Sequence, residues 1–477
     1  MAVWRDRTIL AAASIAVLLL AACGSEDRCA SGACEADLDV YVAPDGDDTA
    51  PGTRERPVRT VRTALRLAAH ATRPDVRLAQ GVYTETEPLV LPDGLRLRGG
   101  YVPGTFEESE ALSELRGASL AVVVRDPKTS GSLRGLRIVA ADAAVPGEAS
   151  IALWTRGARG FRLDHVELRA GRGADGADAI VTGSAPSRDG APGQDGRGGA
   201  IDGENGAGRG GDGGQNPTCP EARGGAGGSG GQRYTAFSGV DGRASAAGAA
   251  GGKGAPESGC TGRAGESAAT VPKLGEAGKQ GAQGLEVGSW DGANARYVAA
   301  RGGDGTAGTS GAGGGGGGGG AGQTGALCTD GAGNGGGGGG AGGCGGAGGL
   351  GGGGGGASIA WLVDDGAPLA FDVRFVTAGG GRGGAGTSGT PGGKGGAGGK
   401  GAAVGLSEIG RGGDGHAGAE GGNGGNGAGG SGGPSLALWV LAGNAEIASA
   451  TYELGPGGAA GQGPLAGAPG KRAERYP

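Results

Sequence analysis

The chain has 477 residues, of which 125 are glycine, 22 are proline and 4% are aromatic, and its formal net charge is -6. A collagen triple helix is excluded, because it needs glycine at every third position together with abundant proline. Nucleic acid is not an expected partner, because the lysines and arginines form no basic stripe with interleaved aromatic residues.

The N-terminus has the pattern of a secretory signal. Arg5 and Arg7 precede an uncharged segment over residues 9–22, which is too short and too alanine-rich for a membrane-spanning helix. The segment ends in Leu-Ala-Ala-Cys-Gly at residues 20–24, which resembles the lipobox of bacterial lipoproteins. A plain secretory signal with a chance cysteine is the alternative.

The lipobox resemblance implies a signal peptide over residues 1–22, lipidation of Cys23 and a tether over residues 23–37. Each buried methylene of an acyl chain contributes roughly 0.8 kcal/mol, so several chains anchor the protein to a membrane without a protein helix. In the family's sorting rules, the glycine after Cys23 favours the outer membrane or the cell surface.

The other six cysteines fall into local pairs, which favours structural disulfides in an oxidising compartment. Nearest-neighbour pairing is one of fifteen connectivities, and it joins Cys29 with Cys34, Cys219 with Cys260, and Cys328 with Cys344. No two cysteines have zinc-ligand spacing, and the chain has only three histidines, so no metal site and no cofactor are expected.

Residues 38–170 have ordinary globular composition. A helix is predicted from Val58 to Ala69, because Val58, Val61 and Leu65 share one face. Short strands are predicted around it, at residues 39–42, 76–79, 82–83, 89–91 and 95–98.

One run of this region carries a specific resemblance, made of the motifs at residues 41–46, 51–53, 60–65 and 78–85. It looks like the first coil of bacterial surface proteins in the pectin-lyase-like superfamily, and a looser match continues through residues 95–101 and 132–139. The resemblance implies an all-β fold, a right-handed parallel β-helix whose open end is covered by an N-terminal capping helix.

Internal repeats extend this prediction into residues 171–470. One strand motif occurs at residues 150–154, 358–362 and 435–439, with 284–287 as a decayed fourth version, and second strands follow at 161–169, 371–377, 450–454 and 297–299. The expected unit is strand, turn, strand and glycine-rich excursion, and the strands stack as rungs. Residues 471–477 are expected to be a basic tail.

Period-two burial is expected for two sets of residues in these strands. They are Ile151 with Leu153, and Phe371 with Val373 and Phe375.

The glycine-rich excursions have three-residue phasing, as in residues 392–400 and 421–426. Three residues per turn is the period of a polyproline-II-type helix, so packed polyglycine-II-like helices are one interpretation. Disordered loops and irregular β-coils are the others. In composition the tracts also resemble PGRS-like surface proteins.

Arg-Gly-Gly-Asp-Gly occurs at residues 209–213, 301–305 and 411–415 and resembles half of a calcium-binding nonapeptide repeat. Asp212, Asp304 and Asp414 are therefore calcium candidates. The aliphatic residue that should follow each aspartate is missing, so solvated loop residues are the alternative.

Many β-helix relatives cleave polysaccharides, so the resemblance makes paired carboxylates candidate catalytic groups. Asp364 and Asp365 are adjacent and are expected to lie in a turn, whereas Asp164 and Asp372 are expected to align, with His165 beside Asp164. The constellations of the hydrolase relatives are missing from the sequence, so no catalytic residue is assigned.

The sequence therefore predicts a non-catalytic, lipid-anchored surface protein with a structural, adhesive or matrix-interaction role. The alternative is a polysaccharide-active or carbohydrate-binding β-helix protein. Exposed Trp154 and Trp439 in a line would favour sugar binding, and buried ones would be core.

Overall fold

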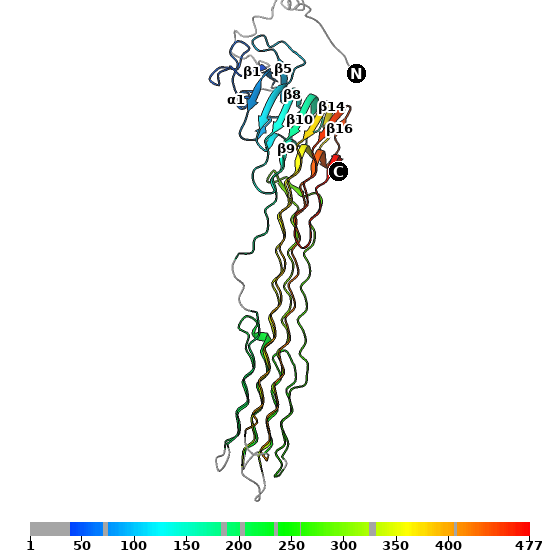
Figure 1. Ribbon diagram of the computed structural model, residues 1–477. Coiled ribbons are helices and arrows are strands. Elements are labelled where there is room, and N and C mark those ends of the chain that lie inside the picture. The colour runs from blue at the N-terminus through cyan, green and yellow to red at the C-terminus, as the bar shows by residue number, and fades with distance from the viewer. Residues whose placement is uncertain are drawn as a thin grey trace, which may run out of the picture.

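The structure is a computed structural model that describes residues 39–69, 75–182, 188–200, 206–232, 237–257, 259–323, 331–404 and 408–477. Figure 1 shows two parts, a head of β-strands and a long rod of glycine-rich chain that extends from it. The expected signal peptide and tether lie outside the described residues, as do Cys23, Cys29, Cys34 and Cys328. No helix in the described ranges is long and apolar enough to cross a membrane.

Two parallel sheets form the head. The main path of the first sheet is β1 (Asp39–Val42), β2 (Asp75–Ala79), β5 (Arg96–Tyr101), β8 (Ser132–Ala140), β10 (Arg162–Ala170), β14 (Leu369–Thr377) and β16 (Glu446–Ile447). Three further strands pair with it, β3 (Val82–Thr84), β6 (Ser113–Gly117) and β17 (Ala450–Leu454). The second sheet has the order β18 (Arg472–Tyr476), β15 (Ser435–Ala442), β13 (Ser358–Asp364), β9 (Ser150–Arg156), β7 (Leu120–Arg125) and β4 (Leu89–Val90). The expectation of an all-β fold is confirmed.

The chain alternates between the two sheets from β7 to β18, apart from one hairpin and from the consecutive strands β16 and β17, which both pair with β14. It leaves the head after β10, β14 and β17 and returns at β13, β15 and β18, which is the predicted unit of strand, turn, strand and excursion. The segment 471–477 contains β18, which pairs in parallel with β15 at the edge of the second sheet.

Helix α1 (Val61–Ala68) lies against β1 and β2 at the first edge of the sheets. Its apolar face is buried in the core, and the Thr60 side chain caps the helix by accepting a hydrogen bond from the backbone of Thr63. Val58, predicted as helical, instead forms a parallel bridge with Val42.

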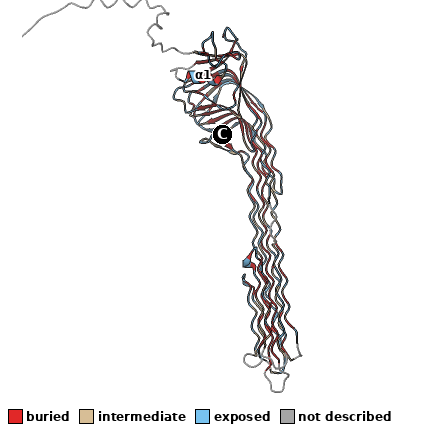
Figure 2. Cartoon of the chain, turned by 90° about the vertical axis from the view of Figure 1, so that its left-hand side faces the viewer, coloured by how far each residue is buried: buried red, intermediate tan, exposed pale blue. Residues whose placement is uncertain are grey.

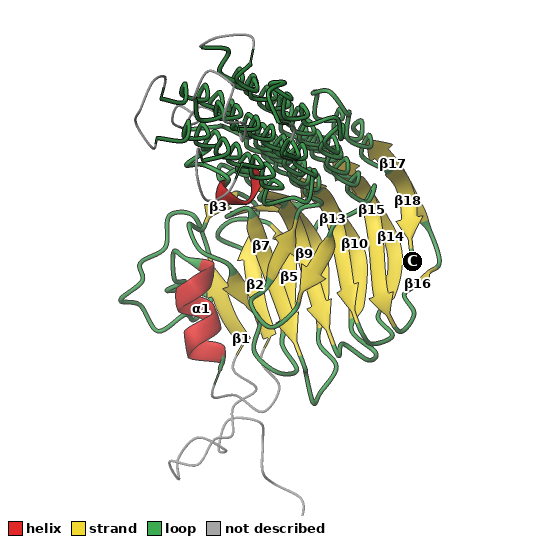
Figure 3. Ribbon diagram, turned by 90° about the horizontal axis from the view of Figure 1, so that it is seen from below, coloured by secondary structure: helices red, strands yellow, loops and turns green. Residues whose placement is uncertain are grey.

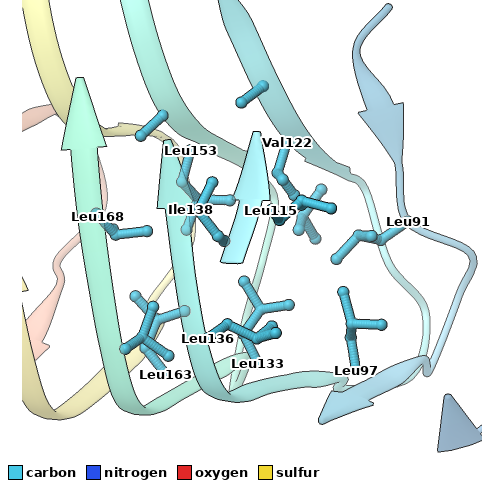
Figure 4. Packing of buried hydrophobic residues seen from close by; sticks show 14 of the residues in the cluster. Leu91, Leu97, Leu115, Val122, Leu133, Leu136, Ile138, Leu153, Leu163 and Leu168 are labelled. Atoms are coloured by element: carbon cyan, nitrogen blue, oxygen red, sulfur yellow. The ribbon is translucent and has the colours of Figure 1, made fainter. Parts of the chain in front are cut away.

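The core lies between the sheets and is built of stacked columns. Leu97, Leu133 and Leu163 occupy equivalent positions on successive strands, and so do Ile138 and Leu168 (Figure 4). Full burial of one such leucine stabilises by about 2 kcal/mol, so the repeats hold together mainly through these columns.

The second sheet is buried on both faces. Its outer face carries Trp154 and Trp439, which are 0% and 3% exposed, and is covered by the antiparallel hairpin of β11 (Ser289–Asp291) and β12 (Arg296–Val298). The predicted fourth rung at residues 284–287 is therefore wrong. Its aromatic neighbours Trp290 and Tyr297 belong to the hairpin and pack on the tryptophans at 5.1 and 6.2 Å between ring centroids.

Period-two burial fails for Ile151 with Leu153, and in the second set it holds only for Val373 with Phe375. Ile151 and Leu153 are both buried but belong to different clusters, because the strand register skips Ala152 between them and the second sheet is covered on both sides. Phe371 is 36% exposed while Val373 and Phe375 are buried. The alternation shifts there because Asp372 has a left-handed backbone conformation, with φ of 48°.

The described residues of the excursions over 171–357, 378–434 and 455–471, apart from the hairpin, pack side by side, mostly as extended threads, and are called the glycine bundle below (Figures 1 and 3). Buried residues run along the whole bundle (Figure 2). The central thread, residues 332–356, has backbone hydrogen bonds with six others, at 188–200, 208–214, 222–231, 302–320, 381–402 and 410–431, and at the head end it also bonds to Ala174 and Ala177.

Hydrogen bonds in the glycine bundle repeat every third residue. Three consecutive glycines donate to three different threads, with Gly336 bonded to Gly228, Gly337 to Gly413 and Gly338 to Gln194, at 2.8, 2.9 and 2.8 Å. Such bonds offset the entropy that glycine loses on ordering. Of the three interpretations of the tracts, packed threads with a three-residue repeat agree with these bonds.

A disulfide joins Cys219 to Cys344, both of them buried. The expected pairs of Cys219 with Cys260 and of Cys328 with Cys344 are therefore wrong; Cys260 is itself disulfide-bonded. Sequence proximity failed because a turn of the chain at Cys219 lies against the central thread, 125 residues away.

Candidate functional site

Two neighbouring strands of the first sheet carry a left-handed residue at the same level. His165 in β10 has φ of 52° and Asp372 in β14 has φ of 48°, and both are skipped by the strand register. Gly135 occupies the equivalent place in β8, with φ of 65°. Glycine adopts this conformation freely, whereas each of the other two residues costs roughly 1 kcal/mol. Strain of this kind concentrates at functional sites.

His165 and Asp372 contact each other directly. The imidazole Nδ1 lies 2.7 Å from Asp372 Oδ2, and Nε2 lies 3.3 Å from the carbonyl oxygen of Glu110. Both ring nitrogens face acceptors, so the doubly protonated, positively charged ring fits the site best. The hydrogen bond to Asp372 is the main cause that raises the pKa of His165 above its ordinary value of 6.5.

Replacing Asp372 with asparagine is expected to lower the pKa of His165, as measured by NMR titration. Because the folded pKa is raised, the pair stabilises the fold fully below pH 6.5 and loses this contribution as the pH rises through the folded pKa. The Tm difference between the wild type and Asp372→Asn should be larger at pH 5 than at pH 8. Equal differences at the two pH values would contradict this assignment.

A cavity of about 360 Å³ opens beside this pair, and its charged lining residues are Arg98, Glu108, Glu110, Arg134, Asp164, His165 and Asp372. Asp164 pairs with Arg134 at 3.5 Å, so each aspartate of the cavity has a basic partner. The expected alignment of Asp164 with Asp372 is wrong by one residue, because Asp164 pairs with Phe371 in the sheet. The mixed charges suit a polar, uncharged or zwitterionic ligand.

Asp364 and Asp365 lie where β13 ends. Asp365 has φ of 66° and accepts a hydrogen bond from the backbone of Gly366. Asp364 is the last residue of β13 and Asp365 begins the turn, so the expected turn is confirmed only for Asp365.

A second cavity, of about 560 Å³, lies between the hairpin, the second sheet and the adjoining end of the glycine bundle. Trp290 and Tyr297 line it, together with Glu148, Arg296 and Arg301. Trp154 and Trp439 lie beneath the hairpin as core residues, so they form no exposed aromatic row.

The calcium candidates lie on the glycine bundle, and two of them, Asp304 and Asp414, connect neighbouring threads. Asp304 binds Arg301 and accepts from the backbone of Gly351 at 2.7 Å. Asp414 Oδ1 accepts from Gly401 at 2.8 Å, and Asp212 pairs with Arg209 at 3.5 Å. Within the described ranges, no three histidine, cysteine, aspartate or glutamate side chains gather as a possible metal site.

Comparison with known families adds one finding. Residues 44–109 match the family model DUF1565. The family is described as a protein of unknown function and is associated with parallel β-helix proteins. No curated protein and no solved structure matches this chain. The matched segment supplies Arg98 and Glu108 of the cavity of about 360 Å³ beside His165, called the polar cavity below. His165 and Asp372 lie outside the matched segment.

Proposed function

We propose that this chain is a non-catalytic surface lipoprotein whose glycine bundle is a rigid stalk with a structural, adhesive or matrix-contact role. The observation that carries the proposal is the hydrogen bonding of the central thread to six neighbours. A linker would need no such order. At about 3.1 Å per residue, the central thread of residues 332–356 spans roughly 80 Å, which carries surface groups far from the head.

The proposal includes a finer account of the fold. The head would be a right-handed parallel β-helix capped by α1, and the stalk would be packed polyglycine-II-type helices. The alternation between two parallel sheets and the three-residue hydrogen-bond repeat support this account.

Lipidation of Cys23 would anchor the head end to the outer membrane or cell surface. The test is the Cys23→Ser variant, followed by acyl-chain labelling, membrane fractionation and protease accessibility on whole cells. The wild type is expected to incorporate label and stay with the membrane, and the variant to lose both. A variant that stays in the membrane fraction as the wild type does would refute the anchor.

Carbohydrate binding at the cavity of about 560 Å³ that Trp290 and Tyr297 line is a second candidate function. It is favoured by the half-buried Trp290, which lines the cavity beside charged Arg296 and Glu148 and whose buried indole N–H has no hydrogen-bond partner among the described residues. Pull-down on insoluble polysaccharides should then be weakened by Trp290→Ala but not by Ala307→Ser on the stalk. Equal retention of the two variants would remove this candidate.

A further inference from the structure

One row of the glycine bundle stops part-way along the stalk. Residues 456–462 lie beside threads 381–402 and 410–431, and Gly458 and Gly461 donate to the carbonyls of Gly433 and Gly430 at 2.8 Å each. In return, the backbone N–H groups of Gly380, Gly383 and Gly386 donate to the carbonyl oxygens of residues 456, 459 and 462. The row ends because the chain then turns back, so that Gly467 and Gly470 bond to Gly461 and Gly458.

Side-chain caps replace the missing row beyond this point. Asn426 and Asn423 accept, through Oδ1, from the backbone N–H groups of Gly389 and Gly392 at 3.0 Å each. Asp414 caps Gly401 in the same way at 2.8 Å. From one cap position to the next, the residue number of the capping side chain decreases by three and that of the capped glycine increases by three.

Two steps of this series lack a cap. Glu420 and Ala417 stand where the caps of Gly395 and Gly398 should be, and in the part of the chain that is described neither glycine N–H has a hydrogen-bond partner. Alanine has no acceptor in its side chain. The carbonyls of Gly415 and Gly418, on the facing thread, also lack a donor among the described residues.

These two donors and two acceptors form a bare backbone surface, called the open edge below and made of Gly395, Gly398, Gly415 and Gly418. All four glycines are half-buried, and a Cβ on Gly395 would lie 2.0 Å from the carbonyl oxygen of Gly418. Residues 456–462 show what sequence a chain segment needs in order to lie in this row. A Cβ on Gly458 or Gly461 would lie 1.9 or 2.0 Å from a carbonyl oxygen of the 381–402 thread. A strand in this row therefore needs glycine at every third residue.

We propose that the open edge binds a glycine thread of a second copy of this chain, so that two stalks associate side by side. The inference rests on the proposed structural role and adds its partner. The row already accepts one glycine thread of this chain higher up, with donors and acceptors at the same three-residue spacing. An uncapped backbone edge pairs readily with a matching strand, and copies anchored to one membrane would meet at high local concentration.

The test introduces asparagine caps at the open edge, like those that the chain already has at Asn423 and Asn426, and the resulting variant is called the sealed variant below. In the Ala417→Asn/Glu420→Asn variant, each asparagine is expected to cap Gly398 or Gly395 as Asn423 and Asn426 cap their glycines. Sedimentation velocity on the full chain in detergent should show concentration-dependent dimers for the wild type and a single monomeric species for the sealed variant. Asn423→Ala/Asn426→Ala, which lengthens the open edge, should dimerise at lower concentration. The control Ala269→Asn, at an exposed position elsewhere on the stalk, should behave as the wild type.

A wild-type chain that is monomeric at every concentration, or a sealed variant that dimerises as the wild type does, would overturn the inference. Amine cross-linking of a mixture of isotope-labelled and unlabelled copies adds a second readout. Cross-links between copies are expected at Lys394 and Lys400, which are exposed beside the open edge. Cross-links confined to the head would overturn the inference even if the sealed variant folded poorly. None of these variants alters Cys23, so membrane attachment tests the proposed function separately.

Discussion

Replacing Gly337 and Gly340 by valine is expected to lower the free energy of unfolding by about 4 kcal/mol and to disorder the glycine bundle before the head. A Cβ on either residue would lie 2.1 or 2.0 Å from a backbone carbonyl oxygen of the neighbouring thread. Overpacking costs roughly 1–3 kcal/mol at each site, and each buried hydrogen bond that breaks adds about 1 kcal/mol or more. Denaturant unfolding followed by circular dichroism measures the loss.

Ala307→Val is the matched control. Ala307 is exposed on a thread of the same bundle, so the extra methyl groups point to solvent and should change stability by less than about 0.5 kcal/mol. A glycine double variant as stable as this control would mean that the threads are not packed as described.

Removal of the Cys219–Cys344 disulfide has the second large expected effect. The bond closes a loop of 125 residues, and the chain-entropy model assigns about 5 kcal/mol to a loop of this size. The Cys219→Ser/Cys344→Ser variant should therefore unfold at clearly lower denaturant concentration. Loss of order should begin in threads 188–231, which the bond fastens to the central thread.

Substitution is a better test than chemical reduction, because a reductant would also break the bond of Cys260. A Ser/Ser variant within about 1 kcal/mol of the wild type would contradict the assigned role of the bond.

The strands of the head were largely predictable from the sequence. The repeated motif at β9, β13 and β15 marked three positions of one sheet, and the strands that follow them pair in the first sheet. The hairpin was missed because its aromatic residues look like those of a buried rung. Their burial comes from covering the second sheet, which periodicity within one strand does not reveal.

The neighbours of each thread were not predictable. Glycine is the same at every position, so nothing in a tract specifies which other tract lies beside it, and the disulfide partner of Cys219 depends on that choice. The caps do leave a signal in the sequence. The aspartate that ends Arg-Gly-Gly-Asp, as in Asp304, accepts from a backbone N–H of the next thread, although the motif also resembles a calcium repeat.

The polar cavity was predicted in part. Repeat alignment brought His165 and Asp372 onto neighbouring strands, but it placed Asp164 opposite Asp372. The left-handed conformation at both positions shifts the contact by one residue, so that His165 is the partner. For non-glycine residues this conformation has no clear mark in the sequence.

Amide hydrogen exchange on the full chain with its disulfides intact tests the central claim most directly. The N–H groups of the central thread, residues 332–356, are bonded to neighbouring threads over most of their length and should exchange as slowly as those of β9 and β13. Fast exchange throughout the thread, with protection confined to the head, would show that the glycine tracts are not a hydrogen-bonded stalk.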